Sequence, residues 1–185
     1  MAPIDEHRRA LAGFTAVVEQ VADDAWGRST PCPAWDARAL VEHVIGFHEF
    51  LLLRPLGLHA RRPRAGAAER WRATEAAIRE AHAAPALVEP AACFDGASRR
   101  PAELLDALAT DTLVHTWDLA RAIGAPARLD RALCARAYDD ALGSGAARAR
   151  SGLFAAPVPV PAEADAQNRL LGLLGRDPAW RPEAG

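Results

Sequence analysis

Apolar side chains recur every three or four positions along most of this chain, which is the pattern of amphipathic helices. In the first such segment, about residues 3–22, the repeat runs through Leu11, Phe14, Val17, Val18 and Val21. The same spacing predicts further helices over about residues 37–53, 67–84, 101–123, 130–142 and 163–174. We therefore expect an all-α fold in which the first four long helices form a bundle. An extra helix and a C-terminal helix would be appended to it.

Prolines, glycines and one acidic residue punctuate this pattern. Pro31 and Pro33 predict an extended loop after the first helix, and Asp36 is placed to cap the second. Gly124 should close the fourth helix. Residues 157–161, with the sequence PVPVP, should be extended and unable to pair fully in a sheet.

Asp111 and His115 carry the most chemical information. They lie four residues apart in the fourth predicted helix, so their side chains share one face with Leu104, Leu108 and Leu119. An unpaired carboxylate on an apolar stripe is costly to bury. A shared metal cation would remove that cost. A plain hydrogen-bonded Asp–His pair is the alternative.

A third ligand would have to come from another helix. His43, on the edge of the apolar stripe of the second helix, is the best candidate. His48 is a rival at helical spacing, and His82 could supply a fourth ligand, whereas we expect His7 and His59 to be exposed. Two imidazoles and one carboxylate suit a divalent transition ion, zinc first and nickel or iron(II) as alternatives, with positions left open for water or substrate.

For the other conspicuous residues, the sequence context favours structural roles. Trp117 and Asp118 follow the Asp–His pair, and we expect Asp118 to point elsewhere and to pair with Arg121 or a loop backbone. Cys32 precedes a helix start, where a thiol pKa can be lowered. Its proline neighbours and Trp35 favour packing instead. These patterns identify no catalytic residue, although His48 or Glu49 would serve as a general base if either pointed inward.

Composition and net charge narrow the range of possible partners and locations. The chain has 185 residues, a net charge of −2 and an isoelectric point near 6.3, which do not indicate a nucleic-acid or anionic-membrane partner. A single domain over residues 1–185 is expected. The three cysteines are far apart and predict no disulfide framework. The polar start and the absence of a long apolar run predict a cytoplasmic protein.

Five segments resemble one family. They are residues 30–35 (TPCPAW), 40–44 (LVEHV), 113–120 (LVHTWDLA), 157–161 (PVPVP) and 170–178 (LLGLLGRDP). They resemble actinobacterial metal-binding proteins related to the N-terminal domain of mycothiol-dependent maleylpyruvate isomerase, within the DinB-like superfamily. The absence of Lys and the abundance of Ala agree with a GC-rich, actinobacterial coding bias.

The resemblance implies a DinB-like four-helix bundle with a metal held by a His on the second helix and a Glu-x-x-x-His pair on a later one. Carried over by position, these are His43, Asp111 and His115. Aspartate is one methylene shorter than the Glu of the pattern, so Asp111 would reach an ion directly or through water. The isomerase also has a C-terminal domain that this chain is too short to include, which argues against maleylpyruvate isomerisation as its reaction.

The resemblance further implies a metal-dependent transferase or isomerase that uses a thiol such as mycothiol on a small molecule. A non-catalytic metal- or ligand-binding bundle is the alternative. A third reading is a bundle in which Asp111 and His115 pair and no ion binds. A homodimer is a further expectation, because apolar helix faces remain to be covered.

Overall fold

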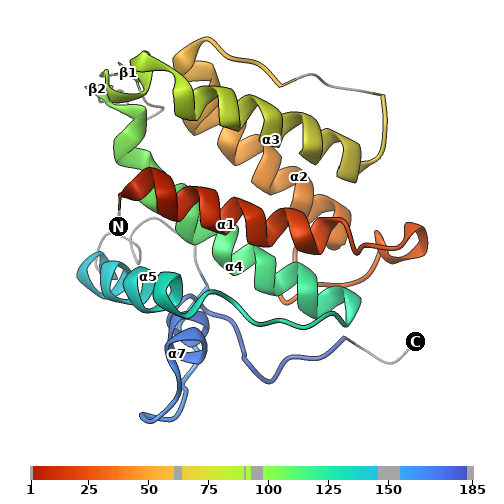
Figure 1. Ribbon diagram of the computed structural model, residues 1–185. Coiled ribbons are helices and arrows are strands. Elements are labelled where there is room, and N and C mark those ends of the chain that lie inside the picture. Colours follow the sequence, from red (N-terminus) through yellow and green to blue (C-terminus); the bar gives the residue numbers. More distant parts are fainter. Residues whose placement is uncertain (1, 61–63, 90, 93–97, 146–154, 183–185) are drawn as a thin grey trace.

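Four long helices build the central bundle of the protein. They are α1 (Pro3–Val18), α2 (Ala37–His48), α3 (Ala67–Ala83) and α4 (Leu105–Ile123). The computed structural model describes residues 2–60, 64–89, 91–92, 98–145 and 155–182. In Figure 1, α2 and α3 lie above α1 and α4. Helix α1 packs mainly on α4, and α2 packs on both α3 and α4, so the four helices enclose one core. The predicted all-α fold is confirmed.

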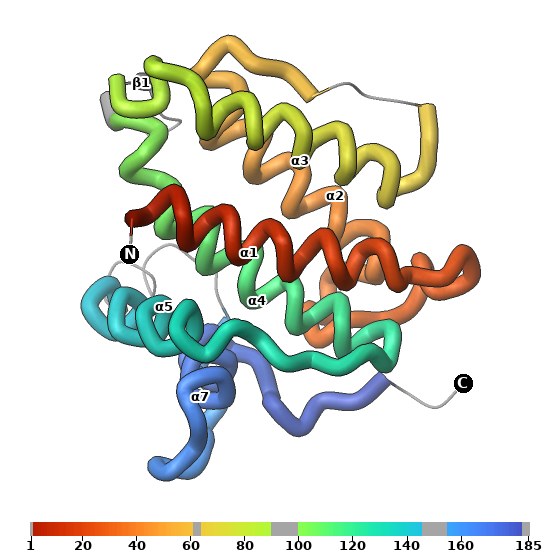
Figure 2. Tube along the Cα trace, in the orientation of Figure 1, coloured from red at the N-terminus to blue at the C-terminus, as the bar shows by residue number. Residues whose placement is uncertain are grey.

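Two further helices lie beneath α4. Helices α5 (Arg131–Gly143) and α7 (Ala166–Leu173) pack on each other, as the tube in Figure 2 shows. Leu113 and Trp117 of α4 join them in a second apolar cluster with Leu133, Leu170 and Leu171. The α3–α4 connection contains a short antiparallel pair, β1 (Ala91–Ala92) with β2 (Ser98–Arg99).

Aspartates begin three of the helices. Asp36 accepts a hydrogen bond from the Ala39 backbone N–H at 2.7 Å, as the sequence predicted, and Asp130 and Asp165 cap α5 and α7 in the same way. Gly124 ends α4 in the left-handed region, with φ of 74°. Helix α1 ends earlier than predicted, at Val18 rather than near residue 22.

Helix α2 continues without a break into a π-helical turn, Glu49–Leu53, and then a 3-10 turn, Arg54–Leu56. The helical segment predicted over residues 37–53 is therefore confirmed. Other single 3-10 turns are Asp23–Ala25, Pro85–Val88 and Pro101–Leu104, the last of which leads directly into α4.

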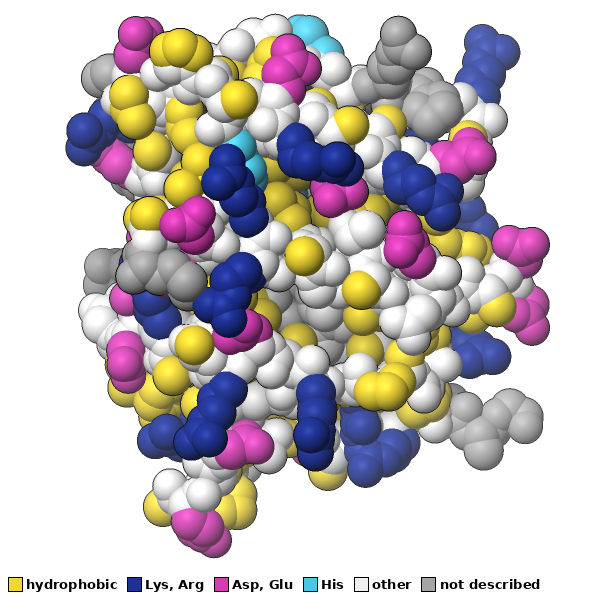
Figure 3. Space-filling view, in the orientation of Figure 1, with side chains coloured by type: hydrophobic (Ala, Val, Ile, Leu, Met, Phe, Trp, Pro, Cys, Tyr) yellow, Lys and Arg dark blue, Asp and Glu magenta, His cyan; other side chains and the backbone are white. Residues whose placement is uncertain are grey.

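On the face shown in Figure 3, basic and acidic side chains are interspersed. Within the described ranges, no helix is both long enough and apolar enough to cross a bilayer.

The C-terminal helix is fixed to residues 157–161 by a very close approach. The Val158 backbone N–H donates to the Gly172 carbonyl at 2.8 Å. A Cβ at Gly172 would lie 2.6 Å from the Val158 carbonyl oxygen and 2.7 Å from Val160 Cγ1, closer than atoms tolerate. Only glycine fits at this position.

We predict that Gly172→Ala lowers the free energy of urea-induced unfolding by about 1–3 kcal/mol, because the methyl group must push backbone apart. The matched control is Gly46→Ala in α2, where an added Cβ meets nothing within 4 Å. There the change should be neutral or stabilising by up to about 1 kcal/mol, since alanine favours the helix. Equal effects of the two substitutions would contradict the proposed contact.

Candidate metal centre

The structure brings His43, Asp111 and His115 together between α2 and α4. Asp111 Oδ1 lies 3.4 Å from His43 Nε2 and 3.5 Å from His115 Nε2. One ligand atom from each residue lies within 4.8 Å of the others. The grouping expected from the sequence is thus present in the folded chain.

Neighbouring rings hold the two imidazoles in place. Trp35, from the proline-containing loop, stacks on His43 with ring centroids 4.3 Å apart and also contacts His115 at 5.5 Å. Phe47, one turn after His43, also stacks on it, with ring centroids 5.7 Å apart. The loop is itself fixed, because the Thr30 hydroxyl donates to the Trp35 carbonyl at 2.8 Å.

The Asp111 carboxylate is only partly compensated. Its Oδ2 is buried and has no hydrogen-bond partner among the described residues. The two Oδ1 distances exceed those of ordinary N–H···O bonds. Burial alone would raise the pKa of Asp111, but His115 and then His43 outweigh it and hold that pKa well below its usual value. Burial likewise opposes the charge of His115, yet Asp111 and then Asp118 raise its pKa well above the ordinary histidine value.

These three groups fit a divalent ion. Two ligands that each lie roughly 2.1 Å from a tetrahedral zinc ion are about 3.4 Å apart, which matches both Oδ1 to Nε2 distances. The shorter aspartate therefore reaches the same space as both imidazoles. The side chains of His43 and Asp111 are 29% and 20% exposed, against 5% for His115, so the group is open on one side.

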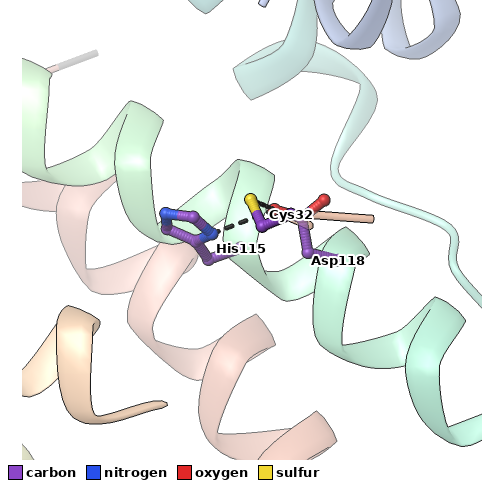
Figure 4. Close-up of side chains that lie close together, drawn as sticks. All are labelled: Cys32, His115 and Asp118. Carbon is purple, nitrogen blue, oxygen red and sulfur yellow. Dashed lines mark hydrogen bonds and ion pairs between the residues drawn. The ribbon is translucent and has the colours of Figure 1, made fainter. Parts of the chain in front are cut away.

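The second ring nitrogen of His115 meets a different group. His115 Nδ1 donates to Asp118 Oδ2 at 2.9 Å, and Arg176 Nη2 donates to the same oxygen at 3.0 Å. The Cys32 thiol is 3.5 Å from this oxygen and 2.9 Å from Arg176 Nη2. Figure 4 shows Cys32 and Asp118 beside the His115 ring.

One sequence expectation is corrected here. Asp118 does not point elsewhere or pair with Arg121; seven residues turn a helix almost two full turns, which returns Asp118 to the face of Asp111. Cys32 is partly exposed and sits next to the candidate centre. The helical spacing contained the signal for Asp118, whereas nothing local in the sequence indicated Arg176.

Cys32, His115 and Asp118 form a second group of ligand-type atoms within 4.8 Å of one another. Here a cation is already in place, because the Arg176 guanidinium lies against both the thiol and the carboxylate. A second positive ion would meet its repulsion. The charge distribution therefore makes His43, Asp111 and His115 the better suited of the two groups for a metal ion.

Three other buried histidines, His7, His48 and His82, form a separate cluster. His7 Nε2 lies 2.9 Å from His48 Nε2, and His7 Nδ1 lies 2.9 Å from His82 Nε2. His48 is therefore no rival to His43, and His82 is no fourth ligand. His7 was expected to be exposed and is fully buried, whereas His59 is exposed as expected.

Hydrogen bonding fixes the tautomers of this cluster when all three rings are neutral. The Val44 carbonyl can only accept, so His48 Nδ1, 2.8 Å away, carries the hydrogen. His48 Nε2 must then accept from His7 Nε2, and His7 Nδ1 must accept from His82 Nε2. This series of hydrogen bonds ends at His82 Nδ1, which is buried and has no partner in the described part of the protein.

The surroundings keep this cluster uncharged. Burial, followed by repulsion from His48 and His82, lowers the pKa of His7 well below its ordinary value. Burial lowers the pKa of His48 as well, although the Val44 carbonyl and then Asp111 oppose the shift. Burial and the nearby Arg8 lower the pKa of His82 to about 4. Because His48 is buried in this cluster, with Nδ1 bonded to the Val44 carbonyl, it does not fit the role of a general base.

Comparison with known proteins places the chain in a family. The sequence profile described as mycothiol maleylpyruvate isomerase N-terminal domain matches residues 7–55. Two uncharacterized proteins of Mycobacterium tuberculosis, from strains CDC 1551 and H37Rv, are each 33% identical over 183 residues, covering 95% of this chain and 98% of the relative. The chain belongs to the mycothiol maleylpyruvate isomerase N-terminal domain family. No solved structure is a significant match.

The matched segment covers only part of the candidate centre. Residues 7–55 include α1, the proline-containing loop and α2, and therefore His43 and Trp35. Asp111 and His115 lie on α4, outside that segment. The mycobacterial relatives extend over nearly the full length of the chain.

The lowered pKa values in the cluster of His7, His48 and His82 predict how the stability of the protein depends on pH. The unfolded chain protonates His82 below about pH 6.5, whereas the folded protein does so only near pH 4. The unfolded state thus binds more protons in this window, so the stability contributed by His82 falls as the pH falls. His82→Gln should reduce the slope of unfolding free energy against pH, between 4.5 and 6.5, by about 1 kcal/mol per pH unit.

Urea unfolding with a chelator present measures this slope without interference from metal. The control is His59→Gln, which removes an exposed histidine outside the cluster and should keep the wild-type slope. A wild-type slope in His82→Gln would show that folding does not lower the pKa of His82.

Proposed function

We propose that this protein binds a divalent transition ion through His43, Asp111 and His115, and that it uses the ion in a thiol-dependent transferase or isomerase reaction on a small molecule. Zinc is the first choice, with nickel or iron(II) as alternatives. Mycothiol is the thiol that the family name suggests. The whole chain is proposed to act as one domain.

The observation that carries the proposal is the unpartnered oxygen of Asp111. A buried carboxylate that lacks a hydrogen-bond partner on one oxygen, beside two imidazole nitrogens, is costly without a cation. The donor set of two nitrogens and one oxygen suits zinc, nickel or iron(II) and leaves positions free for another ligand.

The side chains around the group support a reactive rather than a purely structural site. A bound divalent ion would act as a Lewis acid that lowers the pKa of a coordinated thiol or water, so that either becomes a nucleophile near neutral pH. Partial exposure of His43 and Asp111 leaves a side from which a small molecule can approach. Trp35 covers both imidazoles and would limit the access of water.

Metal content of protein purified without a histidine tag tests the binding claim. We expect close to one ion per chain in the wild type. His43→Ala and His115→Ala should each weaken binding by at least about tenfold, since each removes one of three ligands. His59→Ala, at an exposed position, is the matched control and should keep the wild-type content. If all four proteins lacked metal after incubation with zinc and nickel, the binding claim would be wrong.

Turnover tests the catalytic claim. Zinc- or nickel-loaded protein should consume mycothiol in the presence of an electrophile from a broad panel, and His43→Ala should lose that activity. Wild-type protein whose metal has been removed with a chelator is a second control, and it should also be inactive. A loaded protein that holds its ion but turns over no electrophile would instead be a metal-binding module.

A further inference from the structure

We propose that Asp118 and Arg176 are positioning residues for the metal centre. In this proposal Arg176, from the segment after α7, holds Asp118, and Asp118 fixes the His115 ring with Nε2 facing His43 and Asp111. The inference rests on the proposed function, because the ring that it positions is a proposed ligand.

Asp118 selects which nitrogen of His115 is available. Asp118 is fully buried, and its carboxylate can only accept, so His115 Nδ1 carries a hydrogen in either charge state of the ring. The nitrogen that can offer a lone pair to an ion is therefore Nε2, the one 3.5 Å from Asp111 Oδ1. A carboxylate behind a ligating histidine typically fixes both its tautomer and its orientation.

Arg176 holds the carboxylate from two directions. Its Nη2 lies 3.0 Å from Asp118 Oδ2, and its Nε lies 3.5 Å from Oδ1. Together with His115 these contacts engage both carboxylate oxygens, which prevents rotation of the group. Arg176 also contacts the Cys32 thiol, which lies beside Asp118 in Figure 4.

The backbone prepares Arg176 for this contact. Gly175 has φ of 80°, which ends α7 with a left-handed residue and turns the chain back toward α4. The Arg176 N–H then donates to the Leu171 carbonyl at 2.9 Å, and Nη1 donates to the Leu174 carbonyl at 3.0 Å. The side chain is only 11% exposed, so the guanidinium is held in one place before any ion arrives.

A purely structural role for Arg176 is the alternative, because the residue also anchors the C-terminal segment. A variant at Arg121 distinguishes these two roles. This residue lies on α4 and donates to the Trp180 carbonyl, so it anchors the same segment. In the described structure its contacts are with Trp180 and the Trp117 ring rather than with Asp118. Loss of Arg121 should loosen the segment without releasing Asp118.

The test uses cobalt(II), whose visible absorption reports coordination geometry. Affinity is measured by competition with a chromophoric chelator for the wild type, Asp118→Asn, Arg176→Gln, Arg176→Lys and Arg121→Gln. Circular dichroism checks that each variant is folded. Asp118→Asn should weaken binding by about 10–100-fold. The new amide would turn its oxygen to Arg176 and its NH2 to Nδ1, which moves the ring hydrogen onto Nε2.

Arg176→Gln should weaken cobalt binding by about tenfold and alter the d–d absorption bands, because Asp118 becomes free to rotate. Arg176→Lys, which keeps one charged donor, should recover part of the affinity. Arg121→Gln should stay within about twofold of the wild type, with an unchanged spectrum.

Wild-type affinity and spectrum in Arg176→Gln, in a variant that is folded, would overturn the positioning role even if Asp118→Asn fails to fold. So would an equal loss in Arg121→Gln, since that result assigns the effect to anchoring. Failure of the wild type itself to bind cobalt would instead count against the proposed function, so the two failures are distinguishable.

Discussion

The buried carboxylate of Asp111 is the constraint on which the rest of the site depends. It lies on α4, most of whose residues are buried, and its Oδ2 has no partner within the described residues. Two imidazoles from α2 and α4 are the groups next to it. A carboxylate in that position needs positive charge nearby, and the fold supplies it only partly. A divalent cation held by the same three groups would supply the remainder.

The two histidine clusters show how the surroundings set the chemistry of one side chain. His43 and His48 are five residues apart on one continuous helical segment, yet they belong to different groups. Two carboxylates raise the pKa of His115 despite its burial, whereas burial, followed by neighbouring imidazoles, lowers the pKa values of His7 and His48. The first environment favours positive charge, and the second disfavours it.

Much of this arrangement could be predicted from the sequence, because helical periodicity is local. The apolar repeat gave the long helices to within a few residues, and the spacing of four placed Asp111 and His115 on one face. The burial of His7 was also encoded, since it lies four and seven residues before Leu11 and Phe14 on the apolar stripe of α1. The same stripe argument, applied fully, would have placed Asp118 beside His115.

Contacts between distant segments could not be predicted in this way. Arg176 reaches Asp118 across 58 residues, through a turn made by Gly175 and a helix whose packing depends on α5. Nor could periodicity show that α1, α2 and α3 bring His7, His48 and His82 together. The chemistry of both histidine groups therefore follows from tertiary packing that no local pattern contains.

Anomalous diffraction from a zinc-soaked crystal tests the central claim most directly. The account predicts one anomalous peak within about 2.0–2.2 Å of His43 Nε2, His115 Nε2 and an Asp111 oxygen, with the Asp118 contact to His115 Nδ1 retained. A zinc-soaked crystal with no peak between these three side chains would contradict it.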